Sequence, residues 1–184
     1  MIFMDPGDRL ERAEEREQYD LHENDPADPR YRKFLSHLSV PLLERVAPGS
    51  QGLDFGCGPG PALAMMLEEA GHRMSVFDPY YDNDPRVLES KYDFLTATEV
   101  VEHFHRPGEE FRTMFSLLRP GGWLGVMTSR LSAPEGFASW HYKNDPTHVC
   151  FYADATLVWL AHRHAARVEI LSDRVALFQA GYEP

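Results

Sequence analysis

The sequence predicts an α/β protein with a doubly wound, mainly parallel sheet that is covered by helices on both faces and ends in an antiparallel hairpin. From residue 51 onward, short apolar runs alternate with helical patterns, as is typical of parallel strands joined by crossover helices. A glycine-rich turn, GCGPG, follows the first apolar run. Near the end, RVEIL and RVALFQ are separated only by SD, which is too short for a crossover and predicts a hairpin.

Residues 1–30 are expected to form a charged N-terminal segment that covers the site, ahead of a main domain over residues 31–184. The stretch HENDPADPR is punctuated by proline, which disfavours a packed element there. Before it, DRLERAEEREQYDL predicts a short exposed helix capped by Asp8. Residues 31–46 carry apolar side chains at helical spacing, so we expect a helix there that Pro41 bends or splits.

The elements of the main domain follow from the same patterns. Gly71 is the expected C-cap of the helix after the glycine turn, and the turn RPGG introduces the last parallel strand. The predicted strands are 52–55, 73–78, 92–97 and 122–129, then the hairpin strands 167–171 and 174–179, and the predicted helical segments are 62–71, 99–104, 109–118 and 154–164.

Composition argues against a nucleic-acid-binding protein, a membrane protein and a protein held together by disulfides. The formal net charge of −11 argues against a nucleic-acid partner, because such binding depends on lysine and arginine neutralising phosphates. No apolar run is long enough to span a membrane, and the first twenty residues lack the features of a signal peptide, so we expect a cytoplasmic protein without a membrane partner. Cys57 and Cys150 are isolated in sequence, which indicates neither a disulfide framework nor a cysteine zinc site.

The glycine turn indicates a nucleoside cofactor. Gly56, Gly58 and Gly60 allow a sharp turn and a close approach of the backbone to a ligand. The dinucleotide fingerprint requires a third glycine where this chain has Pro61, so the spacing disfavours a nicotinamide or flavin cofactor. Asp78, at the end of the second strand, occupies the position from which a carboxylate contacts ribose hydroxyls in such folds.

The sequence EVVEH follows a buried strand and contains two acidic residues and a histidine. On a helix, Glu99, Glu102 and His103 would share one face at the carboxyl edge of the sheet, and His148 from a later loop is a fourth candidate. Mixed carboxylate and imidazole groups form a ligand set for a divalent ion such as Mg²⁺, Mn²⁺ or Zn²⁺. In the alternative interpretation, Glu99 contacts the cofactor, Glu102 is solvated and His103 packs beneath the loop.

Four motifs occur in order over residues 50–178: GLDFGCGPG, VFDP, YDFLTATEVVEH and LLRPGGWLGVMT. Together they resemble class I S-adenosylmethionine-dependent methyltransferases, particularly the quinol O-methyltransferases of ubiquinone synthesis. The resemblance implies a Rossmann-like fold and S-adenosylmethionine as the cofactor. ExxEH followed by a loop histidine is similar to the metal site of the small-RNA 2′-O-methyltransferases. The residues that the resemblance assigns to cofactor binding are Asp54, Gly56, Cys57, Gly58, Gly60, Asp78, Pro79, Thr98 and Glu99, with Tyr19 and His22 as cover from the N-terminal segment.

The chain departs from this family between Asp78 and Tyr92, where relatives fit a helix and a third strand. The interval is too short for a full crossover with both elements. We therefore expect the third strand to be missing or reduced, with Tyr80 or Tyr81 beside the adenine instead.

The expected reaction is methyl transfer to an oxygen of a small molecule, with a vicinal diol or catechol as the acceptor. A divalent ion would lower the pKa of the acceptor hydroxyl and fix its position. Without a metal, His148 is the first choice as general base, and His103, His141 and His105 are further candidates. The alternatives are an RNA 2′-O-methyltransferase, a degenerate cofactor-binding sensor and a nicotinamide oxidoreductase, and the oligomeric state is open.

Overall fold

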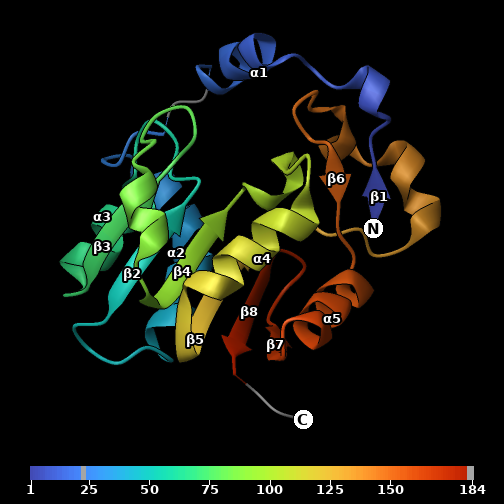
Figure 1. The fold of residues 1–184 in the computed structure, drawn as a ribbon. Helices are drawn as coiled ribbons and strands as arrows, with labels where there is room; N and C mark the ends of the chain where they lie inside the picture. The colour runs from blue at the N-terminus through green and yellow to red at the C-terminus, as the bar shows by residue number, and fades with distance from the viewer. Residues whose placement is uncertain (22–23, 182–184) are drawn as a thin grey trace.

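A six-stranded sheet forms the centre of the protein, whose computed structural model describes residues 1–21 and 24–181 (Figure 1). Its strand order is β3-β2-β4-β5-β8-β7. The pairs β2 with β3, β2 with β4 and β4 with β5 are parallel, whereas β8 is antiparallel to both of its neighbours. The predicted fold class and the terminal hairpin are therefore confirmed. The strands are β2 (Gln51–Phe55), β3 (Arg73–Phe77), β4 (Tyr92–Thr98), β5 (Leu118–Met127), β7 (Ala166–Ile170) and β8 (Val175–Ala180).

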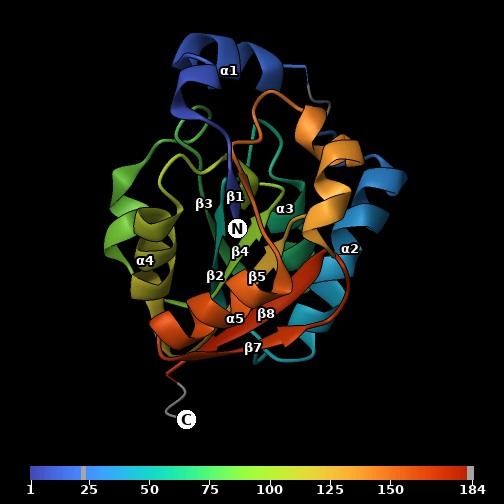
Figure 2. The ribbon, with the colours of Figure 1, turned by 90° about the vertical axis from the view of Figure 1, so that its right-hand side faces the viewer.

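Helices cover both faces of the sheet (Figure 2). One face packs against α2 (Pro29–Leu43) and α3 (Ala62–Glu69), and the other against α4 (Pro107–Leu117) and α5 (Asp154–Arg163). Successive strand residues point to opposite faces, so Phe94 lies in the first core and Leu95 in the second. Two apolar cores thus hold the carboxyl ends of the strands in place.

The N-terminal segment is packed onto the domain and crosses over one edge of it. This N-terminal strap, residues 1–21, contains β1 (Ile2–Phe3), the short helix η1 (Pro6–Asp8) and α1 (Arg12–Tyr19). β1 pairs antiparallel with β6 (Cys150–Phe151), and the chain then runs to α1 at the top of the view in Figure 1. The cap of α1 differs from the prediction, because Glu11 and Glu14 form a reciprocal capping box whereas Asp8 belongs to η1.

Two further local features differ from the prediction. Pro41 does not split α2, because it lies in the last turn of the helix, where the loss of one backbone donor does not end it. The RPGG stretch belongs to β5 as a bulge: Tyr92 pairs with Leu118 but Phe94 with Trp123, and Gly121 takes a positive φ of 78°.

Between β3 and β4 the structure has the short helix η2 (Pro85–Glu89) and no further strand among the described residues. This confirms that the third strand of the family pattern is absent, and it leaves β3 as an edge strand. The remaining short helices are η3 (Val101–His103), η4 (Pro134–Ser139) and η5 (His141–Asn144). Within the described part of the chain, no helix combines the length and apolar character needed to cross a membrane.

Candidate active site

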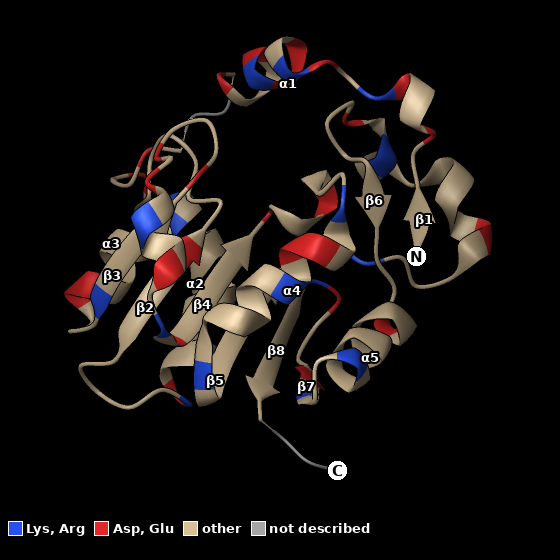
Figure 3. Cartoon of the chain, viewed as in Figure 1, with Lys and Arg blue, Asp and Glu red and all other residues tan. Residues whose placement is uncertain are grey.

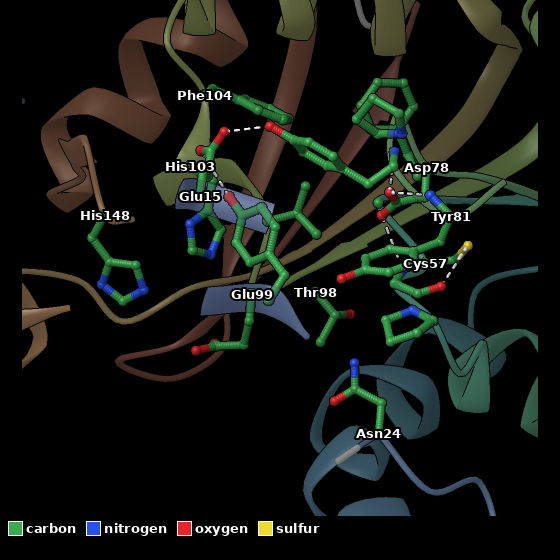
Figure 4. A pocket seen from close by; sticks show the side chains of 18 of the residues that line it. Glu15, Asn24, Cys57, Asp78, Tyr81, Thr98, Glu99, His103, Phe104 and His148 are labelled. Carbon is green, nitrogen blue, oxygen red and sulfur yellow. Dashed lines mark hydrogen bonds between the residues drawn. The ribbon is translucent and has the colours of Figure 1, made fainter. Parts of the chain in front are cut away.

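A cavity of about 1140 Å³ lies at the carboxyl ends of β2, β3 and β4, where residues of the N-terminal strap also line it (Figure 4). Ligands bind at this edge in open α/β sheets. The predicted site residues that line the cavity are Tyr19, Asp54, Gly56, Cys57, Gly58, Gly60, Asp78, Pro79, Thr98, Glu99, His103 and His148. Glu102 is fully buried and lies behind this lining, and His22 falls outside the described residues.

The glycine turn requires glycine for two different reasons. Gly56 and Gly58 have φ values of 77° and 65°, in the left-handed region that side chains disfavour. Gly60 has no such angle, but a Cβ there would overlap the carbonyl oxygen of Asn24. The turn is therefore in close contact with the chain that precedes α2.

Asp78 joins the glycine turn to the loop after β3. Its Oδ2 accepts a hydrogen bond from Gly58 N at 3.0 Å, and its Oδ1 accepts from Tyr80 N at 2.8 Å and Tyr81 N at 3.2 Å. The carboxylate is only 7% exposed. Asp78 thus follows the end of β3 and lines the cavity, and its hydrogen bonds order both the glycine turn and the loop after β3.

Asp54 is a second buried carboxylate on this side of the cavity. Burial raises its pKa to about 6, and the nearby charge of Asp78 acts in the same direction. The hydroxyl of Thr96 donates to Asp54 Oδ1 at 2.6 Å and partly offsets that increase. Burial also raises the pKa of the Cys57 thiol, which keeps the sulfur protonated and weakly nucleophilic at neutral pH.

Glu99 does not share a helical face with Glu102 and His103, contrary to the prediction. It precedes η3 and takes a φ of 50°, so β4 ends there and the chain turns sharply. Oε1 of Glu99 and Oγ1 of Thr98 are buried without a hydrogen-bond partner among the described residues. Both side chains lie at the cavity (Figure 4), where they are available to a ligand.

Glu102, His103 and His148 do come together. One potential ligand atom from each lies within 4.8 Å of the others, and Glu99 is not part of this group. Each imidazole is held by its Nδ1: His103 lies 3.0 Å from Thr147 O, and His148 lies 2.6 Å from Tyr142 O. Hydrogen bonds from Nδ1 to backbone carbonyls are the usual way in which metal-binding histidines are oriented.

The hydroxyl of Tyr142 lies between the two glutamates. It donates to Glu102 Oε1 in a short hydrogen bond and lies 3.3 Å from Glu99 Oε2. Desolvation is the main reason why the pKa values of Glu99 and Glu102 are both raised. Desolvation lowers the pKa of His148, which favours its neutral, metal-binding form. The pair of buried carboxyl groups therefore favours uptake of positive charge, as protons or as a metal ion.

The N-terminal strap closes the other side of the cavity. Glu15 is 8% exposed and accepts hydrogen bonds from Tyr19 OH at 2.9 Å and from Tyr80 OH, the contacts drawn beside its label in Figure 4. The ring of Tyr19 packs edge-on against His103, with 5.2 Å between ring centroids. Asp20 accepts a hydrogen bond from Tyr81 OH at 2.6 Å. Tyr80 and Tyr81 thus line the cavity and also hold the strap.

Sequence reasoning missed two residues of this site, Glu15 and Tyr142. Glu15 lies in a run of charged residues that suggested an exposed helix, but it is buried against Tyr80, which lies 65 positions away in the sequence. Tyr142 is one of several aromatic residues between positions 140 and 152, and no motif distinguishes it from the others. The one local signal that could have identified Tyr142 as a site residue is its position six residues before His148.

Of His105, His141 and His164, two line the cavity and one lies away from it. His141 and His105 line the cavity, and His105 Nε2 lies 3.6 Å from Glu15 Oε1. His164 stacks on Phe115, with 4.5 Å between ring centroids, in line with a structural role.

Comparisons with known proteins bear on the family and on the fold. A family model described as a methyltransferase domain matches residues 22–169. A ubiquinone biosynthesis O-methyltransferase of Caulobacter vibrioides is 35% identical over 78 residues, which are 42% of this chain but only 23% of that protein. A structure of a Pyrococcus horikoshii protein matches with a TM-score of 0.62 and 16% identity, covering 91% of this chain and 99% of the other. An O-methyltransferase family protein of Burkholderia thailandensis matches with a TM-score of 0.59 and 15% identity, covering 91% and 63%.

Proposed function

The chain belongs to the methyltransferase-domain family, and on that basis we propose that it transfers a methyl group from S-adenosylmethionine to a hydroxyl oxygen of a small molecule. The observation that carries the proposal is the convergence of the glycine turn, Asp78 and Glu99 on one cavity. The proposed acceptor is a catechol or another vicinal diol, and the proposed compartment is the cytoplasm. A net charge of −11 continues to disfavour an RNA acceptor.

The residues of the cavity fit the cofactor. Asp54, Asp78 and the glycine turn would hold its methionine and ribose portions, and the unpartnered oxygens of Thr98 and Glu99 would face its cationic sulfonium. S-adenosylmethionine supplies an electrophilic methyl group when it is bound. The protein's part is to hold that methyl carbon in line with the acceptor oxygen and to exclude water.

The group of Glu102, His103 and His148 fits a divalent ion. Oε2 of Glu102 is buried without a hydrogen-bond partner among the described residues, and the Nδ1 atoms of both histidines are already engaged by carbonyls. Two imidazoles and one carboxylate suit Mn²⁺ or Zn²⁺ better than Mg²⁺, which prefers oxygen ligands. A bound ion would lower the pKa of an acceptor hydroxyl and so favour its reactive, ionised form.

In the absence of a metal, the same residues support general-base catalysis. His148 is 7% exposed, lines the cavity and has an Nδ1 held by Tyr142 O, so Nε2 would accept the proton from the acceptor. His103, beside it at 4.8 Å between ring centroids, is the other candidate.

The test combines binding with turnover. Calorimetry with S-adenosylmethionine measures cofactor binding, and formation of S-adenosylhomocysteine is then followed with catechol and with its isomer resorcinol, in which the hydroxyls are not adjacent. We expect turnover of the vicinal diol only, and loss of activity after chelation with recovery on adding Mn²⁺ or Zn²⁺. Failure to bind the cofactor contradicts the proposal, and unchanged activity in a metal-free protein contradicts its metal-assisted form.

A second candidate is a sensor that binds the cofactor without turnover. It is favoured by the absence of a strand and long helix between β3 and β4, which alters the wall where relatives hold the adenine. Tight binding without methyl transfer to any hydroxylated acceptor would support this candidate.

A further inference from the structure

Tyr142 contacts two members of the Glu102, His103 and His148 group through different atoms. It lies in η5, is 8% exposed and lines the cavity. Neither the sequence motifs nor the family match assigns it a role. Its position between the end of β4 and the loop that carries His148 makes it a candidate for positioning both.

The hydroxyl of Tyr142 sets the orientation of Glu102. A phenol has a single proton, and the short contact to Glu102 Oε1 shows where that proton is donated. On its other side, the hydroxyl oxygen lies 3.2 Å from Thr128 Oγ1 and 3.4 Å from Ser129 N, which can donate to it. Oε1 of Glu102 is therefore engaged, and Oε2 has no partner among the described residues.

The main-chain carbonyl of Tyr142 sets the orientation of His148. His148 Nδ1 lies 2.6 Å from Tyr142 O, and the two rings pack with 4.2 Å between centroids. In the neutral imidazole, a proton on Nδ1 places the lone pair on Nε2. One residue thus selects which oxygen of the glutamate and which nitrogen of the histidine are offered to a ligand.

We infer that Tyr142 is a positioning residue for a divalent ion, holding Glu102 so that it binds through one oxygen and His148 so that it binds through Nε2. The inference rests on the metal-assisted form of the proposed function. Outer hydrogen bonds of this kind orient metal ligands, and their loss typically weakens metal affinity by about 10- to 100-fold. The link to Glu99 also connects the ion to the cofactor side of the cavity, since the same hydroxyl lies 3.3 Å from Glu99 Oε2.

The test compares Tyr142→Phe with a matched control, Tyr152→Phe. Tyr152 is fully buried, and its hydroxyl donates at 2.9 Å to the carbonyl oxygen of Val101, the first residue of η3, without a hydrogen bond to a carboxylate. Each variant thus loses one buried hydroxyl. Calorimetry with Mn²⁺ and Zn²⁺ should give about 10- to 100-fold weaker binding in Tyr142→Phe and unchanged binding in Tyr152→Phe. Affinity for S-adenosylmethionine should be the same in the wild type and in Tyr152→Phe, which checks that the control variant is correctly folded.

Cobalt substitution separates positioning from a loss of structure. If Tyr142→Phe frees Oε1, Glu102 can bind Co²⁺ through both oxygens, and the higher coordination number should weaken the visible absorption bands relative to wild type. Equal metal affinity and an unchanged Co²⁺ spectrum in Tyr142→Phe would overturn the inference. Absence of any divalent binding in the wild type would overturn both the inference and the metal-assisted function. Normal metal binding without methyl transfer would contradict only the enzymatic proposal and would leave the role of Tyr142 intact.

Discussion

Cofactor affinity should depend on pH through Asp54, a buried carboxyl on the cofactor side of the cavity. Its pKa is raised to about 6, chiefly by desolvation. The cofactor carries a cationic ammonium and sulfonium, so it should favour the ionised form of Asp54. About nine tenths of the carboxyl is ionised one pH unit above its pKa and about one tenth one unit below, so affinity should fall by about tenfold between pH 7 and pH 5.

Two substitutions make the test specific. Asp54→Asn imitates the protonated side chain, so it should bind weakly at every pH and lose the dependence. The hydroxyl of Thr96 donates to Asp54 Oδ1 at 2.6 Å and so lowers the pKa of Asp54. Thr96→Val removes this hydroxyl, so the pKa of Asp54 should rise and the fall in affinity should begin at a higher pH. Calorimetry across this pH range measures all three proteins, and a wild-type affinity that does not change between about pH 5 and pH 7 would refute the assignment.

The same carboxyl affects stability with a defined sign. The pKa of Asp54 is about 6 in the folded chain and 3.8 in an ordinary environment, so the folded state binds more protons between these values. The free energy of unfolding contributed by Asp54 is therefore fully present below about pH 4 and is lost as the pH rises through about 6. A cationic cofactor should offset that loss, so its stabilising effect should increase with pH. Thermal unfolding with and without the cofactor measures this difference.

Three further predictions follow from the packing. Gly60→Ala should weaken cofactor binding with little change in overall fold, because the added methyl displaces Asn24 from the turn, and calorimetry measures the loss. Glu15→Gln should loosen the N-terminal strap by weakening its hydrogen bonds with the phenol of Tyr80, giving faster tryptic cleavage within residues 1–21; an unchanged cleavage rate would contradict this role. Phe94→Ala should lower the free energy of unfolding by about 3–5 kcal/mol, because this fully buried ring fills the core beside Gly52, and denaturant unfolding tests it.

The parts of the fold that could be predicted are those with a strong local signal. Alternating strands and helices, the glycine turn and the two-residue gap in the terminal hairpin each follow from short stretches of sequence. The absence of a third strand followed from chain length alone. The path of β5 through RPGG was not predictable in this way, because its bulge depends on pairing with β4, which is distant in sequence.

The site shows the same division between local and long-range determinants. The cofactor-side residues, from Asp54 to Asp78, lie at the ends of adjacent strands, so their convergence follows from the topology. Glu99 could not be placed correctly, because a helical face was assumed where the backbone takes a left-handed turn. Tyr142 and Glu15 reach the site through contacts across the chain, which no periodicity in the sequence reveals.

Part of the cavity wall comes from residues outside the family match, and the charge of the wall affects which acceptor can bind. The family match begins at residue 22, so the N-terminal strap with Glu15 and Tyr19 lies outside it, although both residues line the cavity. Around the Glu102, His103 and His148 group, Glu15, Glu99 and Asp145 line the cavity with carboxylates, and Arg9 of the strap donates to His105 O at 3.5 Å. Like charges brought together in a buried site repel each other, so this wall disfavours an anionic acceptor unless a divalent ion compensates. Metal binding and acceptor charge are therefore coupled. A neutral catechol should bind with or without the ion, whereas a catechol bearing a carboxylate should bind only to the metal-loaded protein.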